Sequence, residues 1–204
     1  MSVKVNQVAP NFTTEAYFSV NDEVKKITLS DYKGKWVILF FYPADFTFVC
    51  PTELIDIAEN YDEFKNISTE VIGISIDTVY SHKVWVETEL SKMLNNKSFP
   101  FPLASDLSGK IGQLYGVYDE NTGLDMRGTF IIDPDGVIQS IEINNAPVGR
   151  DSQEIIRKLK GFQYVRASGG NEVCPARWKP GKKSIKPSIK IAGKVYKEAP
   201  SWNE

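Results

Sequence analysis

Two largely apolar runs, separated by a stretch of helical periodicity, are the strongest pattern in the chain. Residues 36–42 form the first run, which Pro43 ends, and residues 70–77 form the second. Between them, apolar side chains recur at the spacing of one helix face: Leu54, Ile57, Ala58, Tyr61 and Phe64. Continuous apolar runs are typical of strands buried on both faces, so we predict a βαβ unit with parallel strands.

The flanking segments predict further elements around this unit. In chain order these are a hairpin over residues 15–29, a helix over 79–94, a loop over 95–105, a short helix over 108–115 and a hairpin over 129–141. The second hairpin is predicted because the turn sequence Asp133–Gly136 separates two apolar runs. A last helix is predicted to start near Asp151, which forms a capping-box pattern with Glu154.

The predicted order of βαβ, helix, β-hairpin and helix is that of an α/β, thioredoxin-like fold with an N-terminal β-hairpin extension. The pattern changes after about residue 165. Residues 168–171 break regular structure, and residues 173–197 carry eight basic side chains and no acidic one. We therefore predict a core over residues 1–165 and a C-terminal arm over 166–204. A basic run of this kind is more often a solvated face than a binding surface.

Composition excludes several functional classes. The net charge of -2 provides no broad basic field for nucleic acid. The longest apolar run is much shorter than the roughly 20 residues that span a bilayer. Residues 1–6 have no apolar signal segment, so we expect a soluble, cytoplasmic protein. Two cysteines and one histidine form neither a secreted disulfide framework nor a typical zinc site, and we predict no metal or cofactor.

Cys50 is the strongest candidate for chemistry because it lies between the first apolar run and the helix that follows. A helix N-terminus presents unpaired N–H groups and a partial positive charge, which favour the reactive thiolate over the thiol. We expect Pro51 to be the first helical residue, which would leave Cys50 at the cap. The alternative is a small buried hydrophobic residue, which is a common setting for cysteine.

Three reactions remain open for a reactive Cys50. Acyl transfer requires a nearby histidine base, and the chain has only His82, which we expect to be a surface or packing residue. Thioredoxin-type exchange requires a second cysteine three positions later, where this chain has Glu53. Peroxide reduction requires a thiolate and a second thiol to react with the sulfenic acid, and Cys174 could supply that thiol.

Four segments resemble the peroxiredoxin family. Pro43, Thr47 and Cys50 match the family's active-site motif in spacing, and Arg127 matches its active-site arginine. Residues 172–181 resemble the segment around the resolving cysteine of typical two-cysteine members, and residues 147–150 match a further family segment. The resemblance extends from about residue 3 to 195 and is greatest to the group that contains bacterial alkyl hydroperoxide reductase C and the thioredoxin peroxidases.

The resemblance implies a role for each of these residues. Cys50 would be the peroxidatic cysteine and Cys174 the resolving cysteine, which would join it in an interchain disulfide. Arg127 would hold the thiolate, although without the motif it would be interpreted as an exposed loop arginine. Thr47 would hydrogen-bond the thiolate and the peroxide, and Pro43 would shield the pocket from water. Glu53 would orient the arginines, with support from Arg150.

The resemblance also implies partners and a state of assembly. The substrate would be hydrogen peroxide or an alkyl hydroperoxide, and the reductant thioredoxin or a dedicated flavoprotein disulfide reductase. Family members form homodimers, which often assemble as pentamers of dimers. Residues 95–102 and 195–197 lack the Gly-Gly-Leu-Gly and Tyr-Phe features of sensitive eukaryotic members. We therefore expect disulfide formation to outpace overoxidation of Cys50.

Two other functions are compatible with the same fold. A peroxide sensor or holdase chaperone would use the Cys50–Cys174 pair to change its assembly, and it would not consume peroxide repeatedly. A thioredoxin-like binding module would keep every activity after Cys50→Ser. The retention of Pro43, Thr47, Cys50 and Arg127 favours the enzyme.

Overall fold

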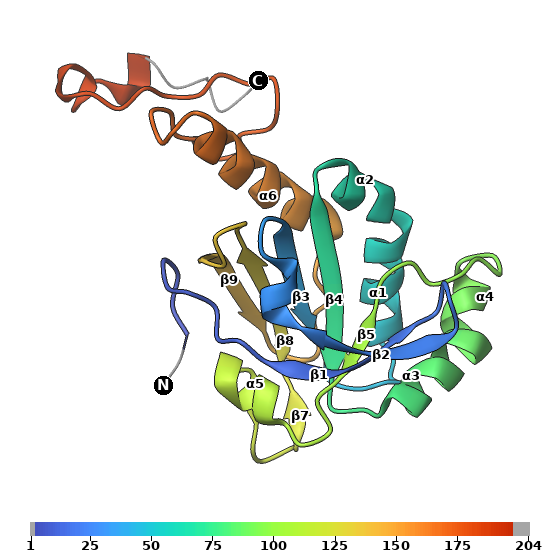
Figure 1. Ribbon diagram of the computed structural model, residues 1–204. Helices are drawn as coiled ribbons and strands as arrows, with labels where there is room; N and C mark the ends of the chain where they lie inside the picture. Colours follow the sequence, from blue (N-terminus) through green and yellow to red (C-terminus); the bar gives the residue numbers. More distant parts are fainter. Residues whose placement is uncertain (1–2, 198–204) are drawn as a thin grey trace. The chain divides into compact units, whose positions relative to one another are not determined.

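The computed structural model describes residues 3–197, which divide into two compact units with the boundary between Ser152 and Gln153. The first unit contains a seven-stranded mixed sheet with the order β2-β1-β5-β4-β3-β8-β9 (Figure 1). The strands are β1 Thr13–Phe18, β2 Glu23–Thr28, β3 Trp36–Phe41, β4 Thr69–Ser75, β5 Leu103–Ser105, β8 Arg127–Ile132 and β9 Ile138–Asn144. The predicted division at residue 165 stays a prediction.

The centre of the sheet follows the sequence pattern. Strands β3 and β4 pair in parallel, with Ile38 opposite Val71, which confirms the predicted βαβ unit. Strands β8 and β9 form the predicted antiparallel hairpin, and β8 also pairs antiparallel with β3. Every residue of β3 is buried, as its continuous apolar run predicts. Because β8 runs against β3, the start of β8 lies at the end of the sheet where β3 finishes.

One strand was missed by the sequence pattern. Residues 103–105, expected in a loop, form β5, which pairs parallel with β4 and antiparallel with β1. A three-residue strand behind Pro100 and Pro102 is too short to show alternation, so only its neighbours reveal it. Through β5, the predicted N-terminal hairpin of β1 and β2 becomes part of the central sheet.

The helices of the first unit also differ in detail from the prediction. The helix between β3 and β4 divides at Asn60 into two helices, and the predicted helix over residues 79–94 contains a π-helical turn. The elements are the short 3-10 helix η1 Leu29–Tyr32, α1 Cys50–Glu59, α2 Tyr61–Asn66, α3 Val79–Trp85, η2 Val86–Leu90, α4 Ser91–Met93 and α5 Lys110–Tyr115, with the small strands β6 Tyr118–Asp119 and β7 Leu124–Asp125.

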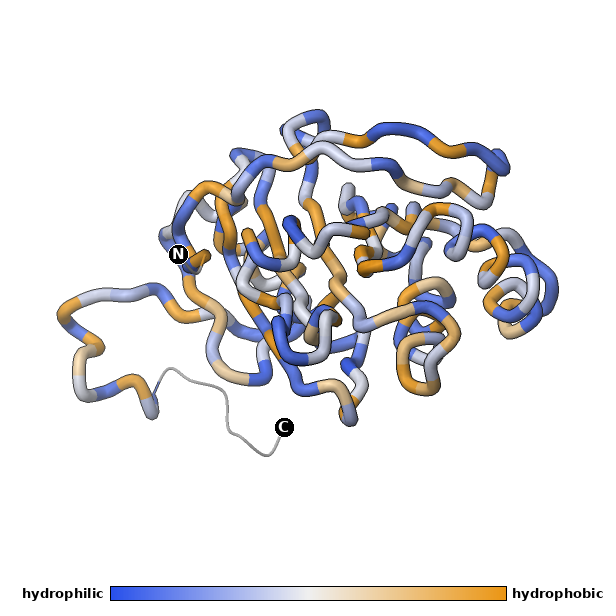
Figure 2. The backbone as a smooth tube through the Cα atoms, turned by 90° about the horizontal axis from the view of Figure 1, so that it is seen from below, coloured by the Kyte–Doolittle hydropathy of each residue, from blue (hydrophilic) through white to orange (hydrophobic). Residues whose placement is uncertain are grey.

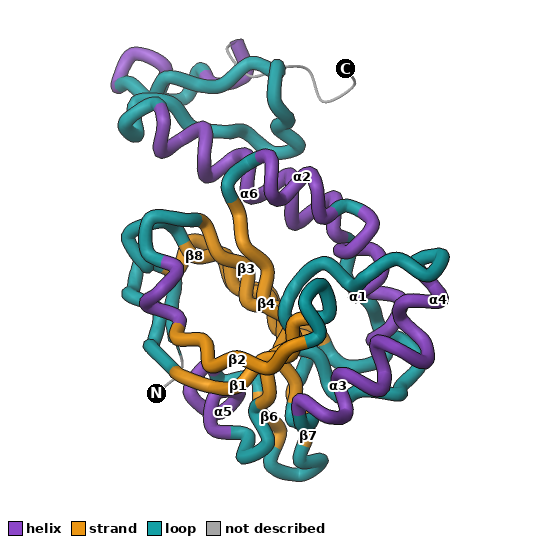
Figure 3. The backbone as a smooth tube through the Cα atoms, turned by 45° about the vertical axis from the view of Figure 1, so that its right-hand side comes forward, coloured by secondary structure: helices purple, strands orange, loops and turns teal. Residues whose placement is uncertain are grey.

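The sheet separates two layers of side chains. Val37, Leu39 and Phe41 alternate along β3 and share one core cluster with Ile111 and Tyr115 of α5. Helices α1 and α3 lie on the other side of the sheet from α5 (Figures 1 and 3). Figure 2 shows hydrophobic residues concentrated along the central strands. The hydrophobic effect therefore holds β3 in the centre of the sheet, with layers of side chains on both of its faces.

The second unit contains α6 Ser152–Ala167 and the segment after it. After Gly169 and Gly170, which both have positive φ, Val173 and Ile185 exchange two backbone hydrogen bonds of 2.9 and 3.0 Å. Two further 3-10 turns follow, η3 Ile189–Ile191 and η4 Val195–Lys197. The predicted arm is therefore folded back on itself around residues 173–185.

Candidate active site

Cys50 is the first residue of α1, and its side chain has no exposed surface. Val49 has helical backbone angles and its carbonyl accepts a hydrogen bond from the Glu53 N–H, so the helix starts one residue earlier than predicted. The prediction that Cys50 lies outside helical geometry was wrong, because Pro51 is accommodated at the second helical position. The thiol still lies in the first turn, where the helix N–H groups are unpaired.

Arg127 reaches Cys50 from the first residue of β8. Its Nη1 lies 3.4 Å from Cys50 Sγ and donates to Glu53 Oε2 at 2.6 Å. Its Nε donates to the Ala146 carbonyl at 2.7 Å, which fixes the plane of the guanidinium. Arg127 is only 3% exposed, so it is a buried residue of the sheet and not an exposed loop arginine. The antiparallel pairing of β3 with β8 brings the two residues to the same end of the sheet.

Glu53 lies between two arginines. Arg150 donates from its Nε to Glu53 Oε1 at 2.9 Å and from its Nη2 to Oε2 at 3.1 Å, and its backbone N–H donates to Oε1 at 2.8 Å. Arg150 Nη1 also donates to the Gly128 carbonyl and to Thr129 Oγ1, and its guanidinium stacks 3.4 Å from the centre of the Phe40 ring. Burial lowers the pKa of Arg150, and Glu53 opposes that effect.

The predicted loop residues precede Cys50 directly. Pro43 is buried at the end of β3. Thr47 is half-buried, and its hydroxyl donates to the Ala44 carbonyl at 2.9 Å. Phe48 is 95% exposed, and Phe46 has a φ of 54°, which is uncommon for a bulky side chain. The structure therefore places Cys50, Arg127, Glu53 and Arg150 in one contact network, with Pro43 and Thr47 in the loop that leads to it.

A buried polar network next to this loop was missed by the sequence analysis. His82, expected to be a surface or packing residue, has no exposed surface, and its Nδ1 lies 2.9 Å from Asp45 Oδ2. Tyr42 donates its hydroxyl to Asp45 Oδ1 at 2.9 Å. Burial and the carboxylate of Asp45 raise the pKa of Tyr42 well above its usual value. The packing interpretation of His82 is therefore the right one, but no periodicity could reveal its polar partners, since Asp45 lies 37 residues away.

Cys174 belongs to the second unit and lies against α6. Its Sγ is 3.7 Å from the Gly161 carbonyl, and a Cβ at Gly161 would lie 3.9 Å from both Cys174 Sγ and the Trp178 ring. Trp178 is buried and packs at a tilt against Tyr164, with 4.9 Å between ring centres. It donates its indole N–H to the Lys182 carbonyl at 3.0 Å. Partial burial raises the pKa of Cys174, and the charge of Arg157 opposes that rise.

Cys50 and Cys174 are both free thiols. Among residues 3–197, no group of three or more histidine, cysteine, aspartate or glutamate side chains is arranged to hold a metal ion. No helix in the described part of the chain is long and apolar enough to cross a membrane. At Cys50 a buried thiol lies next to a guanidinium, which suits attack on a substrate that develops negative charge.

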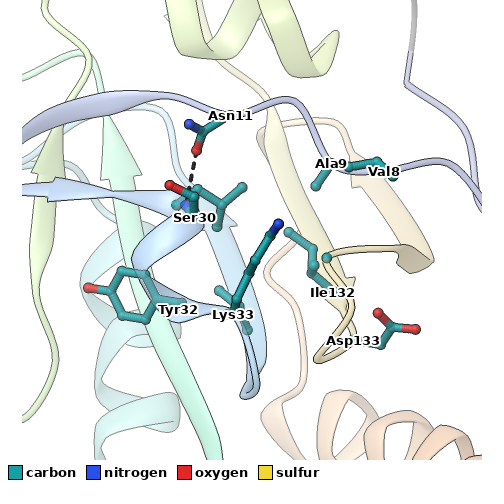
Figure 4. A pocket seen from close by; sticks show the side chains of 11 residues that line it. Val8, Ala9, Asn11, Ser30, Tyr32, Lys33, Ile132 and Asp133 are labelled. Carbon is teal, nitrogen blue, oxygen red and sulfur yellow. Dashed lines mark hydrogen bonds between the residues drawn. The ribbon is translucent and has the colours of Figure 1, made fainter.

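A separate cavity of about 240 Å³ lies at the opposite end of β3 from the one that leads to Cys50. Val8, Ala9 and Ile132 line it together with Val37 near the start of β3, and Figure 4 shows the Lys33 side chain extending across it. Its lining includes none of the residues of the Cys50 network.

Comparison with known proteins supports these observations. Residues 5–141 match the AhpC/TSA family, and residues 161–199 match the C-terminal domain of 1-Cys peroxiredoxin. The chain is 48% identical over 196 residues to the selenocysteine-containing peroxiredoxin PrxU of Peptoclostridium acidaminophilum, a match that covers 96% of this chain and 95% of that protein. It is 47% identical over 195 residues to alkyl hydroperoxide reductase C of Amphibacillus xylanus, with 96% and 100% covered.

The crystal structure of reduced Plasmodium vivax 2-Cys peroxiredoxin has the same fold, with a TM-score of 0.87 and 35% identity over 95% of this chain and 99% of that one. This similarity confirms the predicted α/β, thioredoxin-like fold class.

Proposed function

Because the chain belongs to the AhpC/TSA family of peroxiredoxins and is a thiol-dependent peroxide reductase, we propose that Cys50 is its peroxidatic cysteine and Cys174 its resolving cysteine. The observation that carries the proposal is the 3.4 Å contact between Arg127 Nη1 and Cys50 Sγ in a site closed to solvent. A guanidinium at that distance remains in place for the negative charge that forms during reaction.

The first step is attack of the Cys50 thiolate on the terminal oxygen of a hydroperoxide. An S–O bond forms as the O–O bond breaks, and the departing alkoxide takes up a proton and leaves as an alcohol, or as water when the substrate is hydrogen peroxide. Cys50 becomes a sulfenic acid. Arg127 stabilises the charge on the departing oxygen, and Glu53, held by Arg150, keeps Arg127 oriented toward the sulfur.

The second step is attack of the Cys174 thiolate on the Cys50 sulfenic acid. A disulfide forms and the sulfenic oxygen leaves as water. A dithiol partner, either thioredoxin or a flavoprotein disulfide reductase, then reduces the disulfide by thiol–disulfide exchange. Cys50 is buried and Cys174 lies against the Gly161 carbonyl, so both segments have to open locally before their sulfurs can bond.

We also propose a cytoplasmic homodimer in which Cys174 of one chain resolves Cys50 of the other, with pentamers of dimers as the larger assembly. Strand β9 supports this proposal, because it is an edge strand of the sheet and Ile143 on it is 41% exposed. An unpaired edge with apolar side chains can pair with the same strand of a second copy.

Non-reducing gels test the cycle. Reduced protein, Cys50→Ser and Cys174→Ser are each treated with one equivalent of hydrogen peroxide. A covalent dimer in the unsubstituted protein that is absent from both variants supports the interchain disulfide. A monomer that has lost both thiols would mean an intrachain disulfide and would contradict the dimeric cycle. Intact mass after high peroxide is expected to show little addition of two oxygens to Cys50.

A further inference from the structure

One peptide group in the loop before Cys50 is hydrogen-bonded on both sides. The peptide joins Ala44 to Asp45. Its N–H, which belongs to Asp45, donates to Asp77 Oδ2 at 2.8 Å. Its carbonyl, which belongs to Ala44, accepts the hydroxyl proton of Thr47 at 2.9 Å. A continuous chain of hydrogen bonds therefore runs from Asp77, just after β4, to Thr47, three residues before Cys50.

Asp77 is itself held in a single orientation. Ser75 Oγ donates to Asp77 Oδ2 at 2.7 Å, and the Asp77 N–H donates back to Ser75 Oγ at 3.2 Å. Ser105 Oγ donates to the Asp77 carbonyl at 2.6 Å. Ser75 and Ser105 lie opposite each other in the pairing of β4 with β5. The acceptor oxygen that meets the Asp45 N–H is thus positioned by the central sheet and not by the loop.

The two bonds of this peptide reinforce one another. A strong acceptor on the N–H polarises the peptide and makes its carbonyl a better acceptor, because hydrogen bonds in a chain are cooperative. A threonine hydroxyl has one proton to donate and lone pairs to accept with. When the proton is directed at the Ala44 carbonyl, the Thr47 oxygen presents only lone pairs elsewhere. An alkyl hydroperoxide carries one O–H donor and hydrogen peroxide carries two. Either can donate an O–H to the lone pairs that the Thr47 oxygen presents.

We propose that Asp77 is a positioning residue for peroxide reduction, acting through the Ala44–Asp45 peptide to direct the Thr47 hydroxyl so that its oxygen accepts the O–H of the hydroperoxide. This inference rests on the function proposed above and adds to it a residue outside the matched motif. The buried Asp45 side chain has separate partners, because its carboxylate accepts from Tyr42 and lies 2.9 Å from His82 Nδ1.

A double-mutant cycle on the oxidation of Cys50 tests the proposal. Stopped-flow fluorescence or a competition assay measures the second-order rate constant with hydrogen peroxide for the unsubstituted protein, Asp77→Asn, Thr47→Val and the double variant. Asp77→Asn is expected to lower the rate constant about tenfold, the scale of one charge-assisted hydrogen bond. In the Thr47→Val background, which has no hydroxyl to direct, Asp77→Asn should have no further effect.

The controls separate a positioning role from a structural one. Thr47→Ser keeps a hydroxyl and should keep the dependence on Asp77. Asp106→Asn alters another carboxylate that follows a sheet strand and accepts a backbone N–H, from Gly112 at 2.7 Å, and it should leave the rate constant unchanged. Equal losses from Asp77→Asn with and without the Thr47 hydroxyl, or no loss at all, would overturn the proposal.

If Asp77→Asn does not fold, Ser75→Ala provides a second test of the proposal. Ser75→Ala removes one of the hydrogen bonds that orient Asp77 and should lower the rate constant about threefold, with the loss cancelled by Thr47→Val. Equal losses in both backgrounds would again overturn the proposal. Failure of the proposed function has a different signature, because the unsubstituted protein would then react with hydrogen peroxide no faster than Cys50→Ser.

Discussion

The two cysteines of this chain lie in contrasting surroundings. Cys50 is enclosed by a network of buried charges in which Glu53 binds Arg127 and Arg150, and its own sulfur contacts Arg127. Cys174 lies against the Gly161 carbonyl, in a small unit whose charged side chains are half-buried or exposed. This contrast fits the proposed roles, in which Cys50 attacks the substrate and the half-buried Cys174 reacts after its segment opens.

The largest effect is expected at Glu53. Glu53→Gln leaves Arg127 and Arg150 buried without their shared carboxylate, and breaking a buried ion pair costs about 3–5 kcal/mol of unfolding free energy. Urea denaturation followed by circular dichroism measures the loss. The matched control is Glu154→Gln, which breaks the partly exposed pair with Arg157 in the second unit and should cost about 0.2–1 kcal/mol. Equal losses of unfolding free energy in the two variants would contradict the difference between the two regions.

Replacing the arginine near each cysteine distinguishes the chemistry of the two sites. Arg127→Gln removes the charge that faces Cys50 and should lower the rate constant for oxidation about 100-fold, as removal of one transition-state donor does. Arg157→Gln removes a charge near Cys174 and should leave that rate constant unchanged. Stopped-flow oxidation with hydrogen peroxide measures both. A Cys50 that reacts normally without Arg127 would refute the assigned role.

The first unit also contains a buried carboxyl group that differs from Glu53, because within residues 3–197 it has no ion-pair or hydrogen-bond partner of the kind that Glu53 has in Arg127 and Arg150. Both oxygens of Asp125 lack a hydrogen-bond partner among the described residues, and burial together with the charge of Asp106 raises its pKa to about 8. The folded state therefore keeps a proton that the unfolded chain releases near pH 4. The native state binds more protons in this window, so the unfolding free energy falls as pH rises from about 4 to about 8.

Asp125→Asn should remove this fall of the unfolding free energy with rising pH. We expect the variant to be more stable than the unsubstituted protein at pH 8 by about 1–3 kcal/mol, because an amide does not titrate and each pKa unit corresponds to about 1.4 kcal/mol. The advantage should shrink toward pH 5. Urea denaturation at several pH values measures it. Hydrogen bonds from Asn121 and Thr122 lower the pKa of the half-exposed Asp119, so Asp119→Asn should show no such trend between pH 5 and 8. Parallel pH profiles for Asp125→Asn and the unsubstituted protein would contradict the prediction.

The smallest effect is expected in the second unit. Trp178→Phe keeps a ring against Tyr164 but loses the hydrogen bond to the Lys182 carbonyl. Loss of about 1 kcal/mol should let the segment open about fivefold more often. In a Cys50→Ser background, the rate at which a thiol reagent labels Cys174 reports that opening. Tyr196→Phe, at a 75% exposed position, is the control, and equal labelling rates would show that Trp178 does not protect the thiol.

The sequence determined those features of the protein that depend on neighbours along the chain. The apolar run of β3, the helical spacing after it and the turn at Asp133–Gly136 are local signals, and they located the βαβ unit, the second hairpin and Cys50 at a strand-to-helix junction. The motif of Pro43, Thr47 and Cys50 likewise spans only a few residues of the chain. Both are readable because periodicity and turn chemistry act over a few residues.

The tertiary structure alone decided which distant residues meet. Glu53 contacts Arg127 74 residues away and Arg150 97 residues away, and Asp45 meets Asp77 32 residues away. These contacts follow from the antiparallel register of β3 with β8 and from the short strand β5, neither of which has a local signal. A buried charge is stable only where its partner is brought to it, and strand pairing across the sheet determines that partner.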